Sequence, residues 1–179
     1  MENLRTGEKI AGASGVALLL IMFIFDWFSY GEGAFEAGGN AWDTMELIRF
    51  ILLLAALAGI GLAVMAATQS QVDMPIAMSA LAAGLGGLAV LLVAFRIISP
   101  PDFGIGDAFG EDFDVGRSIG VFLGLIASAG VAYGGWTAMQ EEGTSFGGQA
   151  DRLGGGGDAP PPPPPADPPP PPPPAGPAA

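Results

Sequence analysis

Four long apolar runs constrain the fold of this chain more than any other feature of its sequence. They cover about residues 10–28, 47–68, 75–98 and 118–139, and they are almost free of charged side chains. A helix rises about 1.5 Å per residue, so about 20 residues cross a hydrocarbon core of about 30 Å. None of the runs has the polar face that a helix of a soluble bundle presents to water. The sequence therefore predicts an all-α fold, a four-helix transmembrane bundle.

The first run begins like a secretory signal peptide, because the basic residues Arg5 and Lys9 precede it. It is longer than the roughly 7–15 apolar residues of a cleaved signal. It also ends in the bulky sequence FDWF at residues 25–28, without the small residues of a cleavage site. We therefore expect it to remain as the first membrane helix.

The segments between the runs differ in length and indicate two helical hairpins. Residues 29–44 and 99–116 are long, Gly-rich and acidic, whereas residues 69–74 form a very short link. Pro75 is expected in the first turn of the third helix, where its missing N–H group costs nothing. Both long loops should then lie on one side of the membrane.

The composition changes after the fourth run, which divides the chain into a membrane domain, residues 1–139, and a tail, residues 140–179. The tail is rich in glycine and then in proline, with proline runs at 160–165 and 168–174. It has too few apolar residues to form a core, so we expect a disordered tail with polyproline II segments. These segments are either a stiff, solvated spacer or a ligand for a proline-recognising partner.

Several functional classes are disfavoured by composition. The net charge of −12 argues against a nucleic-acid partner, which requires clustered Lys and Arg. The chain contains no cysteine and no histidine, so thiol chemistry, Ser–His catalysis and the common zinc sites are excluded. We expect no enzymatic activity, no cofactor and no metal site.

Basic residues give a weak indication of orientation. The two groups of basic residues expected on opposite sides are Arg5, Lys9 and Arg152, and Arg49, Arg96 and Arg117. The count is equal, but the first helix usually dominates and both nearby basic residues precede it. We therefore expect a multi-pass protein of the cell membrane with both termini in the cytoplasm. Two interfacial aromatic belts are also expected: Trp27, Phe28, Tyr30 and Trp42 on the loop side, and Tyr133 and Trp136 opposite.

A row of small residues follows the fourth helix at intervals of four. This small-residue row comprises Gly116, Gly120, Gly124 and Ser128. Residues four apart share a helix face, and small side chains let a second helix approach closely in lipid. The row indicates either packing within the bundle or association with itself or with other membrane proteins through the fourth helix.

Charged residues gather at the loop-side membrane boundary. This interfacial charge belt comprises Asp26, Glu46, Arg49, Arg96 and Arg117. Charges at this depth are costly and usually paired, and the spacing suggests Glu46 with Arg49, and Asp26 with Arg96 or Arg117. The belt is either a structural ring of ion pairs or the entrance of a path for an ion or small anion. The acidic segment 102–114 is a further candidate, for calcium, although it lacks the EF-hand spacing.

Three short motifs carry a family resemblance: RTGEK at residues 5–9, FDWF at 25–28 and NAW at 40–42. Together they resemble small uncharacterised four-helix integral membrane proteins of high-GC Gram-positive bacteria. In that group the first helix ends in a Leu-Pro-Trp-like element, and here Asp26 stands in place of the proline. The resemblance implies a four-helix membrane protein and no catalytic residues.

Two functions of different classes fit these features. One is a structural or interaction protein that sits in the lipid bilayer and packs against partner membrane helices. The other is a small channel or transporter subunit with a charged outer entrance. The middles of the helices offer almost no polar residues beyond Ser14, Ser79 and Ser128, which disfavours conduction.

Overall fold

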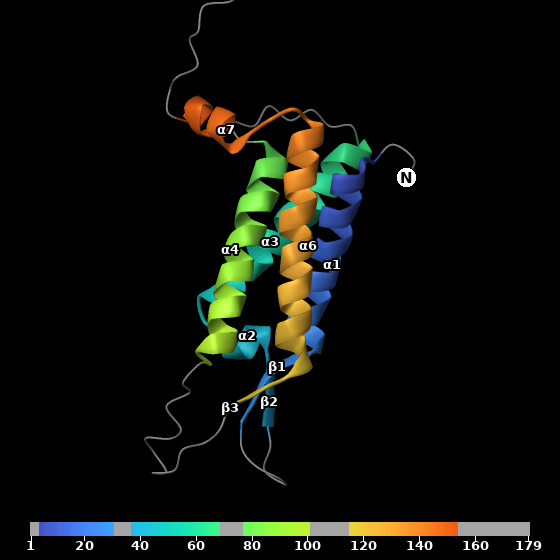
Figure 1. Ribbon diagram of the computed structural model, residues 1–179. Helices are drawn as coiled ribbons and strands as arrows, with labels where there is room; N and C mark the ends of the chain where they lie inside the picture. The colour runs from blue at the N-terminus through green and yellow to red at the C-terminus, as the bar shows by residue number, and fades with distance from the viewer. Residues whose placement is uncertain (1–3, 31–36, 69–76, 101–114, 154–179) are drawn as a thin grey trace, which may run out of the picture.

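Four long helices form a bundle in the computed structural model, which describes residues 4–30, 37–68, 77–100 and 115–153 (Figure 1). The long helices are α1 (Thr6–Ile24), α3 (Ile48–Thr68), α4 (Met78–Ile98) and α6 (Ile119–Glu141). Each is long and apolar enough to cross a membrane. The predicted four-helix bundle is confirmed.

The four helices alternate in direction and pack in a ring (Figure 1). α1 packs against α3 and α6, and α4 packs against the same two helices. The start of α1 therefore lies at the same end of the bundle as the end of α6. At this terminal end, the Arg5 guanidinium donates from Nη1 to the Glu141 carbonyl oxygen at 2.9 Å.

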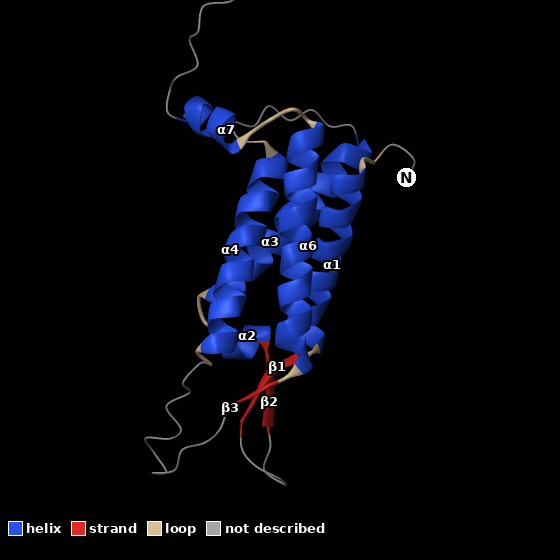
Figure 2. Ribbon diagram, in the orientation of Figure 1, coloured by secondary structure: helices blue, strands red, loops and turns tan. Residues whose placement is uncertain are grey.

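A small antiparallel sheet lies at the opposite end, the sheet end (Figure 2). Its strands are β1 (Asp26–Tyr30), β2 (Ala37–Asn40) and β3 (Val115–Arg117), in the order β2-β1-β3. The sequence predicted a first helix to residue 28 and plain loops here, and both expectations are wrong. Aromatic residues at 27, 28 and 30 favour a strand, and pairing with two other segments satisfies its backbone groups.

A local hydrogen bond explains where α1 begins. α1 starts at Thr6 because the Glu8 carboxylate accepts the Arg5 N–H at 2.8 Å, which satisfies a backbone donor at the helix start. The α1 residues 6–9 were outside the predicted range, because their polarity hides them from a hydropathy window. The predicted role of Pro75 lies outside the described residues.

Two short helices complete the structure. α2 (Ala41–Thr44) is capped by Asn40, whose side-chain oxygen accepts the Trp42 and Asp43 N–H groups at 2.8 and 3.1 Å. α7 (Phe146–Leu153) follows α6 at the terminal end. The prediction of disorder from residue 140 is therefore wrong as far as residue 153. The proline runs of the tail lie beyond the described part of the chain.

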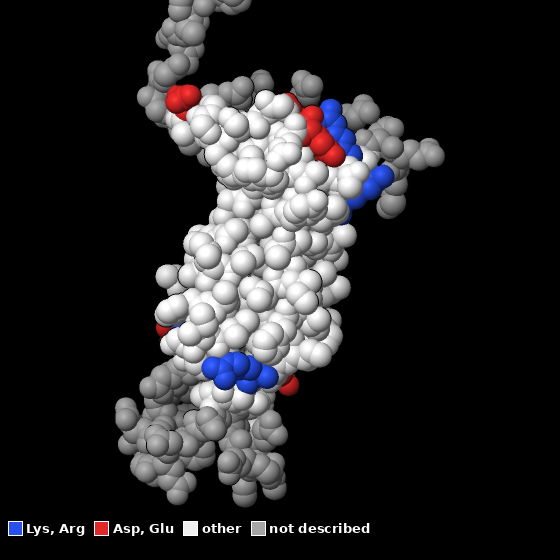
Figure 3. All heavy atoms as spheres, in the orientation of Figure 1, with Lys and Arg blue, Asp and Glu red and all other residues white. Residues whose placement is uncertain are grey.

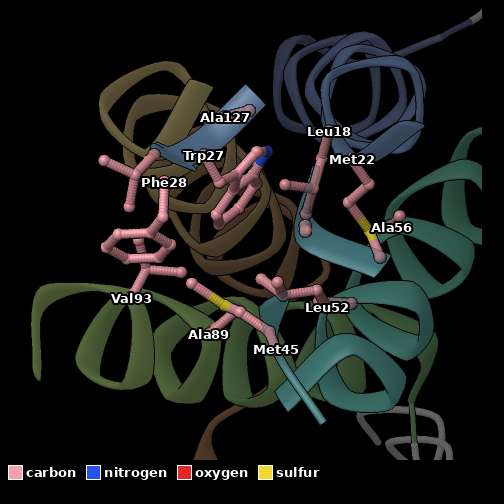
Figure 4. Packing of buried hydrophobic residues seen from close by; sticks show 13 residues of the cluster. Leu18, Met22, Trp27, Phe28, Met45, Leu52, Ala56, Ala89, Val93 and Ala127 are labelled. Atoms are coloured by element: carbon pink, nitrogen blue, oxygen red, sulfur yellow. The ribbon is translucent and has the colours of Figure 1, made fainter. Parts of the chain in front are cut away.

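The core changes in character along the bundle. At the sheet end it contains large side chains, and Figure 4 shows Trp27 pointing between the helices and Phe28 pointing toward Val93 of α4. Toward the terminal end the buried cluster is mostly alanine, with Leu62 and Val131. Small side chains of this kind let neighbouring helices approach one another closely.

The outer surface of the bundle is apolar along most of its length. Leu91 of α4 and Ile126 of α6 are each 68% exposed, and many other large apolar side chains are also exposed. Figure 3 shows the charged atoms of the visible face gathered toward the two ends, with an uncharged band between them. Such a surface is unfavourable in water and suited to lipid.

Candidate functional site

The small-residue row on α6 lies inside the molecule, against β1. A Cβ atom at Gly120 would lie 2.8 Å from Cδ1 of Trp27, and a Cβ at Gly124 would overlap the six-membered ring of the same indole. Ser128 is fully buried, and its hydroxyl donates to the Gly124 carbonyl oxygen at 2.8 Å. The Trp27 side chain therefore fills the space beside Gly120 and Gly124, and no free groove remains there for a partner helix.

Gly116, the first member of the row, does not belong to α6. It lies in β3 opposite Ser29 of β1, and a Cβ at Gly116 would lie 2.5 Å from the Ser29 hydroxyl oxygen. The interval of four that links it to Gly120 is therefore a coincidence of sequence.

Trp27 is the residue whose position sequence reasoning missed. Trp27 and Phe28 were expected to anchor the protein at the membrane surface, but both side chains are 0% exposed and pack inside the protein. The Trp27 indole N–H donates to the Ile21 carbonyl oxygen at 3.1 Å, so the polar edge of the ring is satisfied inside the protein. The signal in the sequence was the pair of α6 glycines, which leave the space that an indole fills.

Close backbone contacts continue along α6 toward the terminal end. Gly134 lies against the backbone of Ala11 and Gly7 of α1, and Gly135 lies against Ser79 and Ala83 of α4. Any side chain at these positions would meet backbone atoms, which cannot rotate away. These contacts fix α6 between its two neighbours.

Arg49 of the interfacial charge belt is held by aromatic rings and a carbonyl group. Its guanidinium carbon lies 5.2 Å from the Trp42 ring centroid and 5.1 Å from that of Phe50. Nη1 donates to the Trp42 carbonyl oxygen at 2.9 Å, whereas the buried Nε has no hydrogen-bond partner. The arrangement is a cation–π clamp between α2 and the start of α3.

The other two arginines lie near the end of α4. The Arg117 Nε donates to the Ile97 carbonyl oxygen at 2.6 Å, where the negative end of the α4 dipole favours a cation. Arg96 is half-buried on α4, and its buried Nε has no hydrogen-bond partner. Arg117 therefore ties β3 to α4.

The acidic members of the belt are not paired with these arginines. Asp26 begins β1, pairs in register with Asn40 and holds its carboxylate beside Gly38. Glu46 is exposed just before α3. Within the described residues, no ion pair joins either carboxylate to Arg49, Arg96 or Arg117, so the pairings suggested by spacing are not formed.

An open face lies on α4. In the four long helices, a Cβ added at any other glycine would meet a neighbouring atom within 4 Å, but at Gly84 and Gly87 it would meet nothing. Leu88 and Leu91 follow on the same outward side and are 42% and 68% exposed. The α4 open face, defined by these four residues, is therefore a shallow apolar surface that no described part of the chain covers.

The described Asp and Glu residues form no group suited to metal binding, and the candidate calcium segment 102–114 lies outside the described part of the chain. No protein-family model, curated protein or solved structure matches the chain.

Proposed function

We propose that this chain is a structural membrane protein that packs through the α4 open face against a transmembrane helix of a partner, either a second copy or another membrane protein. The observation that carries the proposal is the pair Gly84 and Gly87, three residues apart, where an added Cβ would have no described atom within 4 Å. In lipid, helices associate by close packing at small residues. At every other glycine of the long helices except Gly61, an added Cβ would lie closer than 3.0 Å to a neighbouring atom, which leaves Gly84 and Gly87 for an external helix.

The small-residue row on α6 is less suited to an external helix than the α4 open face. Gly120 and Gly124 lie against Trp27, so a partner helix would have to displace a buried indole. Substitutions there would damage the fold as well as any interface. Gly84 is exposed, so a substitution there can weaken an interface without damaging the fold.

The decisive experiment is Gly84→Leu in the full chain, with Ala129→Leu as the matched control. Both residues are exposed, small and on long helices, but Ala129 lies on α6 away from the α4 open face. Self-association is measured by energy transfer between labelled copies in liposomes, and partner capture is measured in mild detergent. We expect Gly84→Leu to reduce association and Ala129→Leu to leave it unchanged. Equal association of all three proteins, or no association of the unmodified chain with any membrane protein, would refute the proposal.

The alternative, a small channel or transporter subunit, has less support. The buried polar side chains of the described residues are Glu8, Thr44, Ser79 and Ser128, and the Ser128 hydroxyl is already bonded within α6. The centre of the sheet end is filled by Trp27 and its apolar neighbours (Figure 4). Ion flux into liposomes that disappears on Arg96→Ala would favour the channel instead.

A further inference from the structure

We propose that α7 is an interfacial helix whose Phe146 side binds the boundary between headgroups and acyl chains of the bilayer that the bundle crosses. The inference goes beyond the partner helix at α4 and concerns a different surface at the terminal end. It rests on the turn that separates α7 from α6, on the faces of α7, and on its contact with Trp136.

The turn after α6 is a defined stop that redirects the chain. Gly143 has φ +68°, a conformation that favours glycine. Its N–H donates to the Gln140 carbonyl at 3.0 Å, and the Thr144 N–H donates to the Met139 carbonyl at 3.0 Å. This bonding pattern is the Schellman motif, which ends a helix and satisfies its last carbonyl groups.

A new helix then begins with its own cap. The Ser145 hydroxyl oxygen accepts the Gly148 N–H at 3.2 Å, as expected of an N-cap residue. Figure 1 shows α7 turned away from the axis of the bundle rather than continuing α6. The segment is therefore placed beside the membrane-spanning part and not within it.

The sequence of α7 gives it two unlike sides. Residues four and seven positions apart share a helix face, so the repeat groups positions 146, 150 and 153, which are Phe, Ala and Leu. Asp151 falls on the other side and is exposed. With one acidic and one basic residue in the helix, electrostatic attraction to lipid is weak, and apolar insertion must carry the binding.

The contact between Phe146 and Trp136 sets the depth of α7 in the bilayer. The Phe146 ring centroid lies 5.8 Å from that of Trp136, and the two side chains are 44% and 47% exposed. Trp136 and Tyr133 lie on the outward side of α6 near its end, where tryptophan and tyrosine mark a membrane interface. The apolar side of α7 is thus continuous with the lipid-facing surface of α6.

α7 would be a weak helix in isolation, which supports its binding to a surface outside the chain. It has eight residues, two of them the glycines at 147 and 148. Helices shorter than about 12 residues are marginal in water, and glycine weakens them further. A bilayer interface that accepts Phe146 would supply the stabilisation that the sequence lacks.

The test uses single cysteines, because the chain has none of its own. Ala150→Cys and Asp151→Cys in the full-length protein are spin-labelled and reconstituted into phosphatidylcholine liposomes. Collisions with oxygen report lipid exposure, and collisions with a water-soluble nickel chelate report water exposure. We expect the label at 150 to favour oxygen several-fold more than the label at 151. Adding Phe146→Ser to the Ala150→Cys protein should shift that label toward the nickel reagent.

Two outcomes would overturn the proposal. Free access of the nickel reagent to position 150 would place α7 in water. Protection of position 150 from both reagents would place that side of α7 against protein, either the bundle or a second copy. Neither outcome depends on the α4 open face, so this experiment and the Gly84→Leu experiment can fail separately.

Discussion

At the scale of single residues, the sheet end depends on the fit between one indole and two glycines. Trp27 reaches from β1 to α6, and its ring lies where Gly120 and Gly124 have no side chains. Its N–H group is bonded to the Ile21 carbonyl, so burial leaves no polar edge unsatisfied. One aromatic residue thus connects the end of the first span to the start of the last.

Gly124→Ala is expected to destabilise the protein, because the added methyl group would overlap the Trp27 ring. Overpacking of this kind costs about 1–3 kcal/mol. Gly84→Ala is the matched control, since its Cβ meets nothing within 4 Å. The measurement is unfolding by denaturing detergent, followed by circular dichroism, at a dilution where the protein is monomeric. An equal midpoint for both variants would show that Trp27 does not occupy this position.

At the scale of elements, the sheet closes the bundle by pairing segments far apart in the sequence. β1 follows α1 directly and β3 precedes α6, and their register places Ser29 opposite Gly116. The same pairing extends to β2, which leads into α2 and α3. Three of the four long helices are therefore joined at this end by backbone hydrogen bonds.

A disulfide is expected between Ser29→Cys and Gly116→Cys on mild oxidation. The Ser29 Cβ lies 3.8 Å from the Cβ position at Gly116, and the mean distance in disulfides is about 3.8 Å. Ser29→Cys with Arg117→Cys is the control, because Arg117 pairs with Phe28 and consecutive residues of a strand face opposite sides of a sheet. Gel mobility without reductant reports the bond. Comparable yields from both pairs would argue against this register.

The helices were predictable from the sequence, whereas the sheet was not. Hydropathy over about 20 residues identifies a span from local composition alone, and α3 and α4 match their predicted ends at residues 68 and 98. β1 depends on partners 14 and 89 residues away, in the pairs Asp26 with Asn40 and Phe28 with Arg117, and the second partner lies far outside any local window. The apolar sequence that continues past Ile24 therefore resembled more helix.

The same limit applies to the candidate site residues. The small-residue row was visible as an interval of four, but its occupant is a side chain from β1. Arg49 and Glu46 have the spacing of an ion pair, yet Arg49 turns to the Trp42 and Phe50 rings. Spacing indicates which groups can meet, and the tertiary arrangement decides which of them do.

At the scale of the whole molecule, the two ends of the bundle differ in chemistry. The terminal end holds the start of α1, the end of α6 and α7, and the sheet end holds β1, β2 and β3 (Figures 1 and 2). Arg5 contacts the Glu141 carbonyl, and the Ser79 hydroxyl donates to the Glu142 carboxylate at 2.6 Å. The segments at the terminal end must therefore share one side of any membrane that the bundle crosses.

The proposed orientation places that terminal end in the cytoplasm. Single cysteines at Lys9 and Glu141, both exposed, should react with a membrane-impermeant maleimide only in inside-out vesicles. A cysteine at Glu46, exposed at the sheet end, should react only in intact cells. Labelling with the two ends exchanged would reverse the orientation while leaving the fold unchanged, and labelling of 9 and 141 from different sides would contradict the fold.

The packing of Trp27 against Gly124 also has a consequence for synthesis and membrane insertion of the chain. A ribosome that adds about 5–20 residues per second needs on the order of 5–20 s to travel from one codon to the other. Trp27 is therefore synthesised well before Gly120 and Gly124, the glycines against which its indole packs. Insertion of the last span therefore completes the sheet end, and a nascent chain stalled before residue 124 should still offer Trp27 to the lipid or to an assembly chaperone.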